Sequence, residues 1–148
     1  MLADHDNFNL DLLRQRGEEI RRAISILARH ASLPQNDFVE DQTIVDAAKY
    51  RLLIAIEAAI AICTHLTARM AGKAPATYAQ CFEELARSGI ISQELADRLG
   101  RMARFRNLLV HVYAEVDDNR VWETLQSDLQ DLESYLSAIG EAIKEQIQ

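Results

Sequence analysis

Residues 37–71 carry the longest helical repeat of apolar side chains in this chain. The repeating positions are Ile44, Ala48, Leu52, Ile56, Ala59, Cys63, Leu66 and Met70. The middle of the segment is apolar nearly all round, which is typical of a helix buried on every side. Its most apolar stretch, 52–63, is about twelve residues long and contains Glu57, whereas a membrane span needs about twenty apolar residues. We therefore expect a core helix around which the other elements pack, and no membrane association.

Local signals predict where this helix begins and ends. Asp37 and Glu40 have the spacing of a capping box, with Asp where Ser or Thr is commoner, so we expect the helix to start at Asp37. Gly72 and Pro75 follow the last apolar position, and these residues commonly end helices. The predicted helix therefore runs to about Ala71.

The same kind of pattern predicts four further helices. They cover residues 7–30, 76–87, 93–113 and 121–145. Pro34 separates the first helix from the central one, since proline cannot continue the helical hydrogen bonds. Gly89 ends the short helix, Ser92 can cap the next one, and residues 117–119 read as a turn.

The composition supports a chain built from helices alone. Only five Gly and two Pro occur in 148 residues, and Val, Thr, Tyr and Phe are scarce beside Ala, Leu, Ile, Glu and Arg, which favours helices over sheets. We expect an all-α fold, an antiparallel four-helix bundle with an additional short helix at 76–87. The length suits a single domain over residues 1–148.

The distribution of charge is uneven. A net charge of −7 argues against a protein that coats nucleic acid non-specifically. Residues 97–113, however, carry four Arg against one Asp, a local charge of +3, whereas residues 114–133 carry seven acids against one Arg, a local charge of −6. A selective phosphate-binding site in an acidic protein would need such a basic segment, although a solvated helix face with charge pairs looks the same.

Several classes of site are absent from the sequence pattern. Cys63 and Cys81 have no second Cys or His at ligand spacing, which favours buried thiols over a disulfide or a zinc site and fits a cytoplasmic location. Residues 1–6 lack the basic and then apolar pattern of a signal peptide. No Gly-rich phosphate loop, paired-carboxylate metal site or Ser-His-Asp arrangement occurs. We expect neither a metal ion nor an organic cofactor.

The segment 106–113, Arg-Asn-Leu-Leu-Val-His-Val-Tyr, is the most informative part of the chain for function. Arg106 is a permanent cation that grips phosphate through a rigid fork, and His111 titrates near neutrality. Together they could hold a phosphodiester and move a proton beside it without a metal. The alternative is a His and an Arg on an ordinary helix.

The spacing within this segment has a geometric consequence. On a continuous helix Arg106 and Tyr113, seven residues apart, share a face, whereas His111 lies about 140° around from Arg106. One straight helix therefore cannot direct Arg106 and His111 at one point. Either the helix unwinds near His111, or a second copy of the segment completes the site, which a two-fold homodimer would achieve.

The pattern Arg-x4-His-x-Tyr, with Asn directly after the Arg and an all-helical N-terminal half before it, resembles the HEPN superfamily. It most resembles the HepT-like toxins, which pair with MntA minimal nucleotidyltransferases. The stretches 47–53, 58–66 and 75–82 and the Leu-rich terminal helix fit the same pattern, so the resemblance covers nearly the whole chain. Two residues depart from it: Arg104 stands where Gly is expected, and Ala61 where the group often has Asp.

This resemblance implies a metal-independent ribonuclease whose site forms across a homodimer. His111 would take the proton from a ribose 2′-hydroxyl or return one to the leaving oxygen, and Arg106 would stabilise charge on the phosphate oxygens. Asn107 would orient the phosphate or the helix end. Tyr113 resembles the tyrosine that an MntA-like nucleotidyltransferase antitoxin modifies with AMP, which would switch the site off.

Further RNA phosphate contacts are expected from Arg98, Arg101 and Arg104. A second hypothesis is a non-catalytic helical bundle that binds a nucleotidyltransferase and presents a substrate to it.

Other candidates favour structural roles. His65 reads as a core histidine with one hydrogen bond rather than a catalytic group. Glu57 reads as a buried acid paired with an Arg of the basic segment, and the alternative is an acid that faces solvent. Trp122, Tyr78 and Phe82 read as packing residues, since they do not alternate with basic ones.

Overall fold

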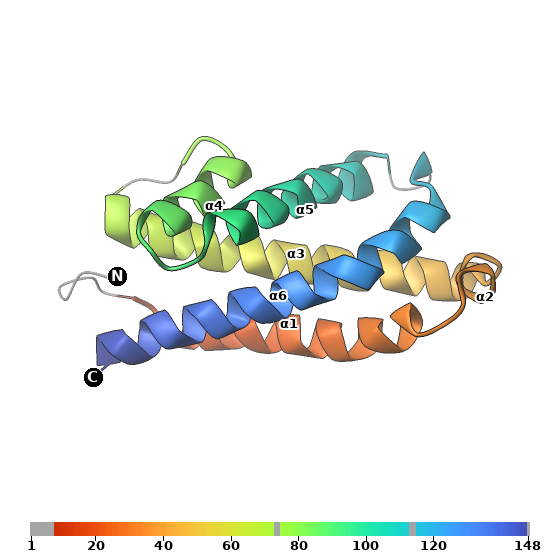
Figure 1. The fold of residues 1–148 in the computed structure, drawn as a ribbon, viewed down its shortest axis with the longest axis horizontal. Helices are drawn as coiled ribbons and strands as arrows, with labels where there is room; N and C mark the ends of the chain where they lie inside the picture. The colour runs from red at the N-terminus through yellow and green to blue at the C-terminus, as the bar shows by residue number, and fades with distance from the viewer. Residues whose placement is uncertain (1–7, 73–74, 113–114, 148) are drawn as a thin grey trace.

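A computed structural model describes residues 8–72, 75–112 and 115–147, and in those ranges the regular structure consists of six helices without a strand. They are α1 (Leu10–Ala31), α2 (Gln35–Val39), α3 (Gln42–Ala71), α4 (Tyr78–Arg87), α5 (Gln93–His111) and α6 (Asp118–Ile147). The long helices α1, α3, α5 and α6 alternate in direction along the molecule (Figure 1). The predicted all-α antiparallel four-helix bundle is confirmed, with two short helices, α2 and α4, in place of one.

Helix α3 is the core element, as its pattern predicts. Leu52, Ile56, Ala59, Cys63 and Leu66 are buried, and all the other helices pack on α3. Residues 42–70 are long and apolar enough to cross a membrane by length and composition alone, but 56% of the most apolar window is buried inside the protein. The burial identifies α3 as the core helix of a bundle.

The predicted start of the central helix at Asp37 is wrong. Residues 35–39 form the separate helix α2, and α3 begins at Gln42, where the Asp41 side chain accepts a hydrogen bond from the Ile44 N–H at 3.3 Å. Asp37 lies in the first turn of α2 and does not cap it. The break lets α2 direct Phe38 into the core, where its side chain is fully buried.

The other helix ends follow local chemistry. Gly72 and Gly89 have φ of 78° and 81°, a left-handed conformation that favours glycine. Ser92 caps α5, and Asn9 and Thr77 cap α1 and α4, which start slightly later than predicted. Helix α6 starts earlier than predicted, at Asp118: residues 117–119 are its capped first turn, since the Asp117 carboxylate accepts from the Asn119 N–H at 2.9 Å.

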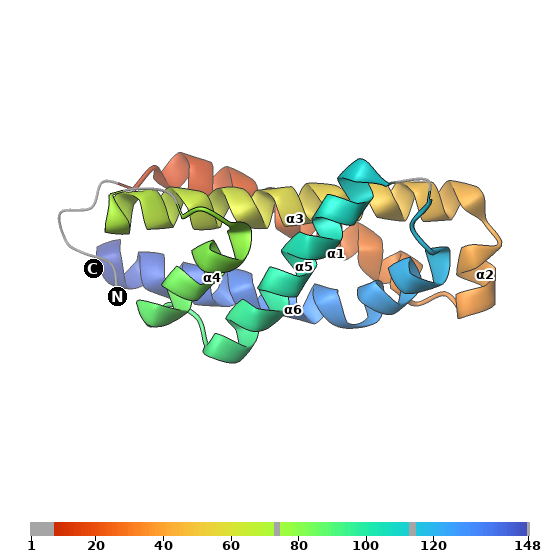
Figure 2. The same ribbon diagram turned by 90° about the horizontal axis from the view of Figure 1, so that it is seen from above.

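Helices α4 and α5 form a hairpin that lies over α3, and α5 crosses α3 obliquely (Figure 2). The C-terminal end of α5 therefore reaches α3 rather than running alongside a bundle neighbour. Beyond α5, the buried Lys49 ammonium of α3 lies 3.2 Å from the Asp118 carboxylate and ties the start of α6 to the core helix.

The core also contains a polar contact that the sequence pattern does not reveal. Tyr135 on α6 is fully buried, and its hydroxyl donates to the Ala59 carbonyl at 2.9 Å. Burial raises the pKa of this phenol well above its usual value. Cys63 and Cys81 are buried free thiols, as expected; burial raises the pKa of Cys63, whereas hydrogen bonding with Cys63 lowers that of Cys81 to about 7.

Candidate functional site

The arginine–histidine segment lies on the last turns of α5. This helix starts at the Ser92 cap and continues without a break through His111, its last residue. Val112 follows with φ −133° and ψ 38°, and its N–H still donates to the Leu108 carbonyl at 2.9 Å. His111 is therefore presented at the end of a regular helix, and its side chain is exposed.

Three helices hold the Arg106 side chain. Its Nε donates to the Glu57 Oε1 of α3 at 2.6 Å, its Nη1 donates to the Asn107 Oδ1 at 3.1 Å, and its guanidinium carbon lies 5.7 Å from the centre of the Tyr78 ring of α4. The pairing expected for Glu57 is confirmed, although the Glu57 side chain is 42% exposed and not buried.

The hydrogen bonds of Arg106 leave part of its charge available. A guanidinium has five N–H donors, and two of them are used within the described residues. The Arg106 side chain is 20% exposed, and within the described residues no buried side-chain nitrogen lacks a hydrogen-bond partner, so the guanidinium nitrogen that makes none reaches the surface. A guanidinium oriented on one edge and free on another is suited to binding a phosphate.

A second face of α5 carries His111. Arg104, Asn107, Leu108 and His111 follow one another at spacings of three, one and three, so they form one stripe along the helix. All four are exposed. Asn107 connects the two faces, because it belongs to this stripe while its side chain accepts from Arg106.

The unbroken helix bears on the first of the two predicted geometries, in which α5 unwinds near His111. Because α5 does not unwind before His111, the directions of Arg106 and His111 remain about 140° apart on its axis. A single described chain does not bring the guanidinium and the imidazole together. A site completed by a second copy, the other predicted geometry, stays a prediction. Tyr113, two residues beyond His111, lies outside the described residues.

The three other arginines of α5 have different surroundings, although Arg101 lines one pocket with Arg98 and another with Arg104. Arg98 Nε donates to the Asp131 carboxylate of α6 at 2.9 Å, so its charge is already paired. Arg101 lines a pocket of about 370 Å³ between α5 and α6 with Asp128. Burial raises the pKa of Asp128 to about 6, and the nearby Arg101 charge opposes that shift. Only Arg104 points from the stripe that carries His111.

Two side chains that were expected to be structural, His65 and Trp122, each make a hydrogen bond to the backbone of another segment. The His65 Nε2 accepts from the Asn9 N–H at 2.9 Å, so it holds the start of α1, and burial lowers its pKa. His65 is half-buried rather than in the core. The Trp122 indole donates to the Leu33 carbonyl at 3.0 Å.

Sequence reasoning missed one contributor to the site. The pattern indicates packing for Tyr78 without naming its partner, and the ring lies against the Arg106 guanidinium. The two residues are far apart in sequence and on different helices, so spacing could not reveal the contact. Within the described residues no group of three His, Cys, Asp or Glu side chains has the geometry of a metal site.

Comparison with known proteins gives consistent matches. The family model described as "Ribonuclease HepT-like" matches residues 20–139. The chain is 31% identical to the mRNA nuclease HepT of Shewanella oneidensis over 104 residues, 70% of this chain and 78% of that one. It is 30% identical to the tRNA nuclease HepT of Aphanizomenon flos-aquae over 133 residues, 87% of this chain and 88% of that one.

A solved structure extends the likeness to the fold. It is that of the tri-AMPylated Shewanella oneidensis HEPN toxin in complex with MNT antitoxin. The TM-score is 0.79 at 27% identity, over 88% of this chain and 98% of that chain. The structural likeness therefore covers most of the bundle, and the family match at residues 20–139 includes the helix that carries Arg106 and His111.

Proposed function

This chain belongs to the ribonuclease HepT-like family, and on that basis we propose that it is the toxin of a toxin–antitoxin pair, an endoribonuclease that works in the cytoplasm without a metal ion. The observation that carries the proposal is the orientation of Arg106 together with the exposure of His111. Glu57 and Tyr78 orient Arg106, which keeps N–H groups that make no hydrogen bond within the described residues. His111 is exposed at the end of the same helix.

In the proposed reaction His111 takes the proton of a ribose 2′-hydroxyl, and the 2′-oxygen attacks the adjacent phosphorus. The bond from phosphorus to the 5′-oxygen breaks, and that oxygen leaves with a proton from a second imidazole or from water. The products are a 2′,3′-cyclic phosphate and a 5′-hydroxyl. Arg106 stabilises the charge that grows on the phosphate oxygens. The need for a 2′-hydroxyl restricts cleavage to RNA.

A homodimer completes the proposed site. Leu108 and Val110 are 38% and 43% exposed, which puts apolar surface next to His111. Exposed apolar patches commonly mark interfaces. A two-fold axis beside this end of α5 would place Arg106 of one copy near His111 of the other. Arg104 and Asn107, on the stripe of His111, are the proposed additional RNA contacts; Arg101 is a weaker candidate, and Arg98 is already paired.

The proposed control of this activity is AMP transfer to Tyr113 by a minimal nucleotidyltransferase of the MntA type. The Shewanella relative is AMPylated in complex with its MNT antitoxin. Tyr113 follows His111 by two residues. Phosphate charge and bulk added there would repel the RNA backbone from the imidazole and block the site.

The test is cleavage of RNA in EDTA by the purified protein, shown by intact mass to be unmodified. We expect the wild type and a His30→Ala control to cleave RNA and His111→Ala to be inactive. Retained cleavage in His111→Ala would contradict the assignment of the base. No cleavage by the unmodified wild type would favour a non-catalytic bundle that presents itself to a nucleotidyltransferase.

A further inference from the structure

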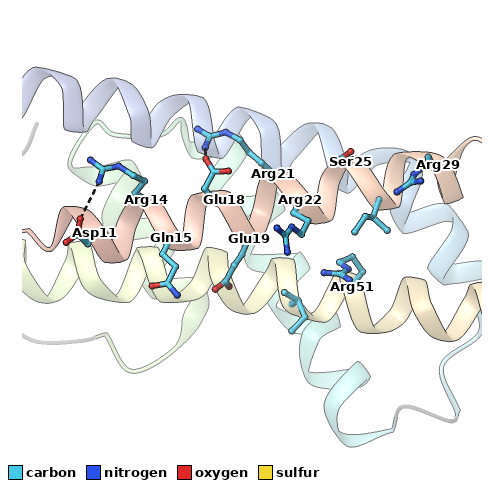
Figure 3. Close-up of a pocket in the computed structure, with 12 residues that line it drawn as sticks. Asp11, Arg14, Gln15, Glu18, Glu19, Arg21, Arg22, Ser25, Arg29 and Arg51 are labelled. Carbon is cyan, nitrogen blue, oxygen red and sulfur yellow. Dashed lines mark hydrogen bonds and ion pairs between the residues drawn. The ribbon is translucent and has the colours of Figure 1, made fainter.

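A groove of about 960 Å³ runs between α1 and α3. Figure 3 shows the charged side chains of α1 spread along it, with Arg22 from α1 and Arg51 from α3 both reaching into the space between the two helices. We call this feature the α1–α3 groove. The groove has two ends of different charge, and the difference suggests what it binds.

At one end each arginine is neutralised by an acid. Arg14 lies 3.3 Å from the Asp11 carboxylate, and Arg21 lies 2.6 Å from that of Glu18. Glu19, which also lines this end, is paired with Arg16 of the same helix. All these pairs are local contacts along α1, so this end carries little net charge.

The other end consists of Arg22, Ser25 and Arg29 of α1 and Arg51 of α3. Within the described residues none of these three arginines has a carboxylate at ion-pair distance; the Arg51 guanidinium lies against the Tyr50 ring, at 5.9 Å from its centre. Arg22, Ser25 and Arg29 follow one helix face, since they are three and four residues apart. The chain has a net charge of −7, yet three arginines without a paired acid lie along the two helices that line this groove.

One arginine of this basic end, Arg51, lies on α3, the helix that also supports the motif arginine. Arg51 precedes Glu57 by six residues, which is about 9 Å along the α3 axis and about 120° around it. Glu57 holds Arg106. A flexible chain bound near Arg106 would therefore meet the basic end after a short path around α3.

We infer that the basic end of the α1–α3 groove binds phosphate groups of the RNA strand that flanks the cleaved linkage. This inference rests on the proposed function. Guanidinium groups bind phosphate oxygens through paired hydrogen bonds, and a row of them along a groove tracks a nucleic-acid backbone without reading its sequence. The Ser25 hydroxyl, between Arg22 and Arg29, supplies a further donor.

The test compares two double variants with the same change in charge on the same helix. Arg22→Gln/Arg29→Gln neutralises the basic end, and Arg14→Gln/Arg21→Gln neutralises two paired arginines of the other end. Both are made in a His111→Ala background, so that RNA stays intact. Binding of a fluorescein-labelled single-stranded RNA of mixed sequence is then measured by anisotropy over a range of salt concentrations, and Arg51→Gln is measured in the same way.

We expect the first double variant to bind RNA about tenfold more weakly and to lose about 1.4 from the slope of log affinity against log salt, because each phosphate contact on a single strand contributes about 0.7. The control should keep the wild-type slope. In chains with an intact His111, the first variant should raise KM for a long RNA without changing kcat. It should cleave a dinucleotide, which is too short to reach the groove, as the wild type does.

Equal slopes in the two double variants would overturn the inference. Unchanged RNA binding with weakened binding to a purified nucleotidyltransferase antitoxin would also overturn it, since the groove would then be a protein docking surface. If the wild type does not cleave RNA at all, the proposed function fails, and the salt slopes still decide whether the groove binds the strand.

Discussion

The Nε of Arg106 donates to the Oε1 of Glu57 across 2.6 Å, so the central helix orients the motif cation of α5. Their side chains are 20% and 42% exposed, and a pair in that position contributes at most about 1 kcal/mol to stability. The contact also sets the direction of the Arg106 side chain, because the carboxylate occupies one edge of the guanidinium; in the proposed function another edge binds phosphate.

Replacing Glu57 should therefore affect activity more than folding. We expect Glu57→Ala to lower kcat roughly tenfold or more with a small change in KM, because a misdirected cation stabilises the transition state poorly. Glu57→Gln should recover much of the rate, since its amide oxygen can still accept from Nε. Urea unfolding should change by less than about 1 kcal/mol. Glu57 would have a structural role only if the loss of kcat matched the loss of folded protein, or if Glu57→Gln recovered no activity.

A site shared between two copies predicts complementation. Arg106→Ala and His111→Ala chains are each expected to be inactive, but mixed after unfolding and refolding together they should regain about a quarter of the wild-type activity. Random pairing makes half of the dimers mixed, and each mixed dimer holds one complete site of two. A mixture that stays inactive while light scattering shows dimers would mean that Arg106 and His111 act from the same chain.

Helix ends could be predicted where the signal is local and unopposed. Pro34, Gly72, Gly89 and Ser92 each act within one turn, and the structure uses them as expected. The start of α3 was mispredicted because two aspartates compete to cap it. Asp37 has the capping-box spacing, but Asp41 makes the hydrogen bond, since the short helix α2 must first bury Phe38.

The site was predictable in its residue types and not in its contacts. The spacing of Arg106 and His111 predicts opposed directions on a helix, and the unbroken α5 has that geometry. The pairing of Arg98 with Asp131 and the stacking of Tyr78 on Arg106 join distant parts of the chain. Such contacts depend on how helices cross, which periodicity within one helix does not specify.

Asp128 predicts a dependence of stability on pH. Burial raises the pKa of its carboxyl to about 6, the neighbouring Asp131 adds to the rise, and Ser127 and Arg101 oppose it. In the unfolded chain this pKa is about 3.9. Between these values the folded protein keeps a proton that the unfolded chain has lost, so the free energy of unfolding falls as the pH rises from about 4 to about 6.

Asp128→Asn should remove this penalty. We expect the variant to be about 1–2 kcal/mol more stable than the wild type at pH 7, allowing for partial solvent screening, and nearly equal at pH 4. Urea midpoints at the two pH values measure the difference, with the exposed Glu133→Gln as control. A gain of the same size at both pH values would show that the carboxyl is not protonated in the folded state.

Tyr135→Phe tests the buried contact between α6 and α3. Its hydroxyl donates to the Ala59 carbonyl in a fully buried position, and removing such a hydrogen bond costs about 1–2 kcal/mol. We expect the urea midpoint to fall while RNA cleavage by the folded protein stays unchanged. The exposed Tyr50→Phe should leave the midpoint unaltered. A large loss of activity in Tyr135→Phe at wild-type stability would contradict a purely structural role.

Tyr113→Phe separates cleavage from its control. The variant lacks the hydroxyl that would accept AMP but keeps Arg106 and His111, so it should cleave RNA at close to the wild-type rate. After incubation with ATP and an MntA-type nucleotidyltransferase, the wild type and a Tyr50→Phe control should gain AMP by intact mass and lose cleavage. Tyr113→Phe should gain no AMP and stay active.

Tyr50 is the matched control because it is the most exposed of the tyrosines in the described part of the chain, at 57%. Modification of Tyr113→Phe at the wild-type level would place the acceptor elsewhere, and inhibition without any gain in mass would mean that the nucleotidyltransferase blocks the RNA path by binding alone.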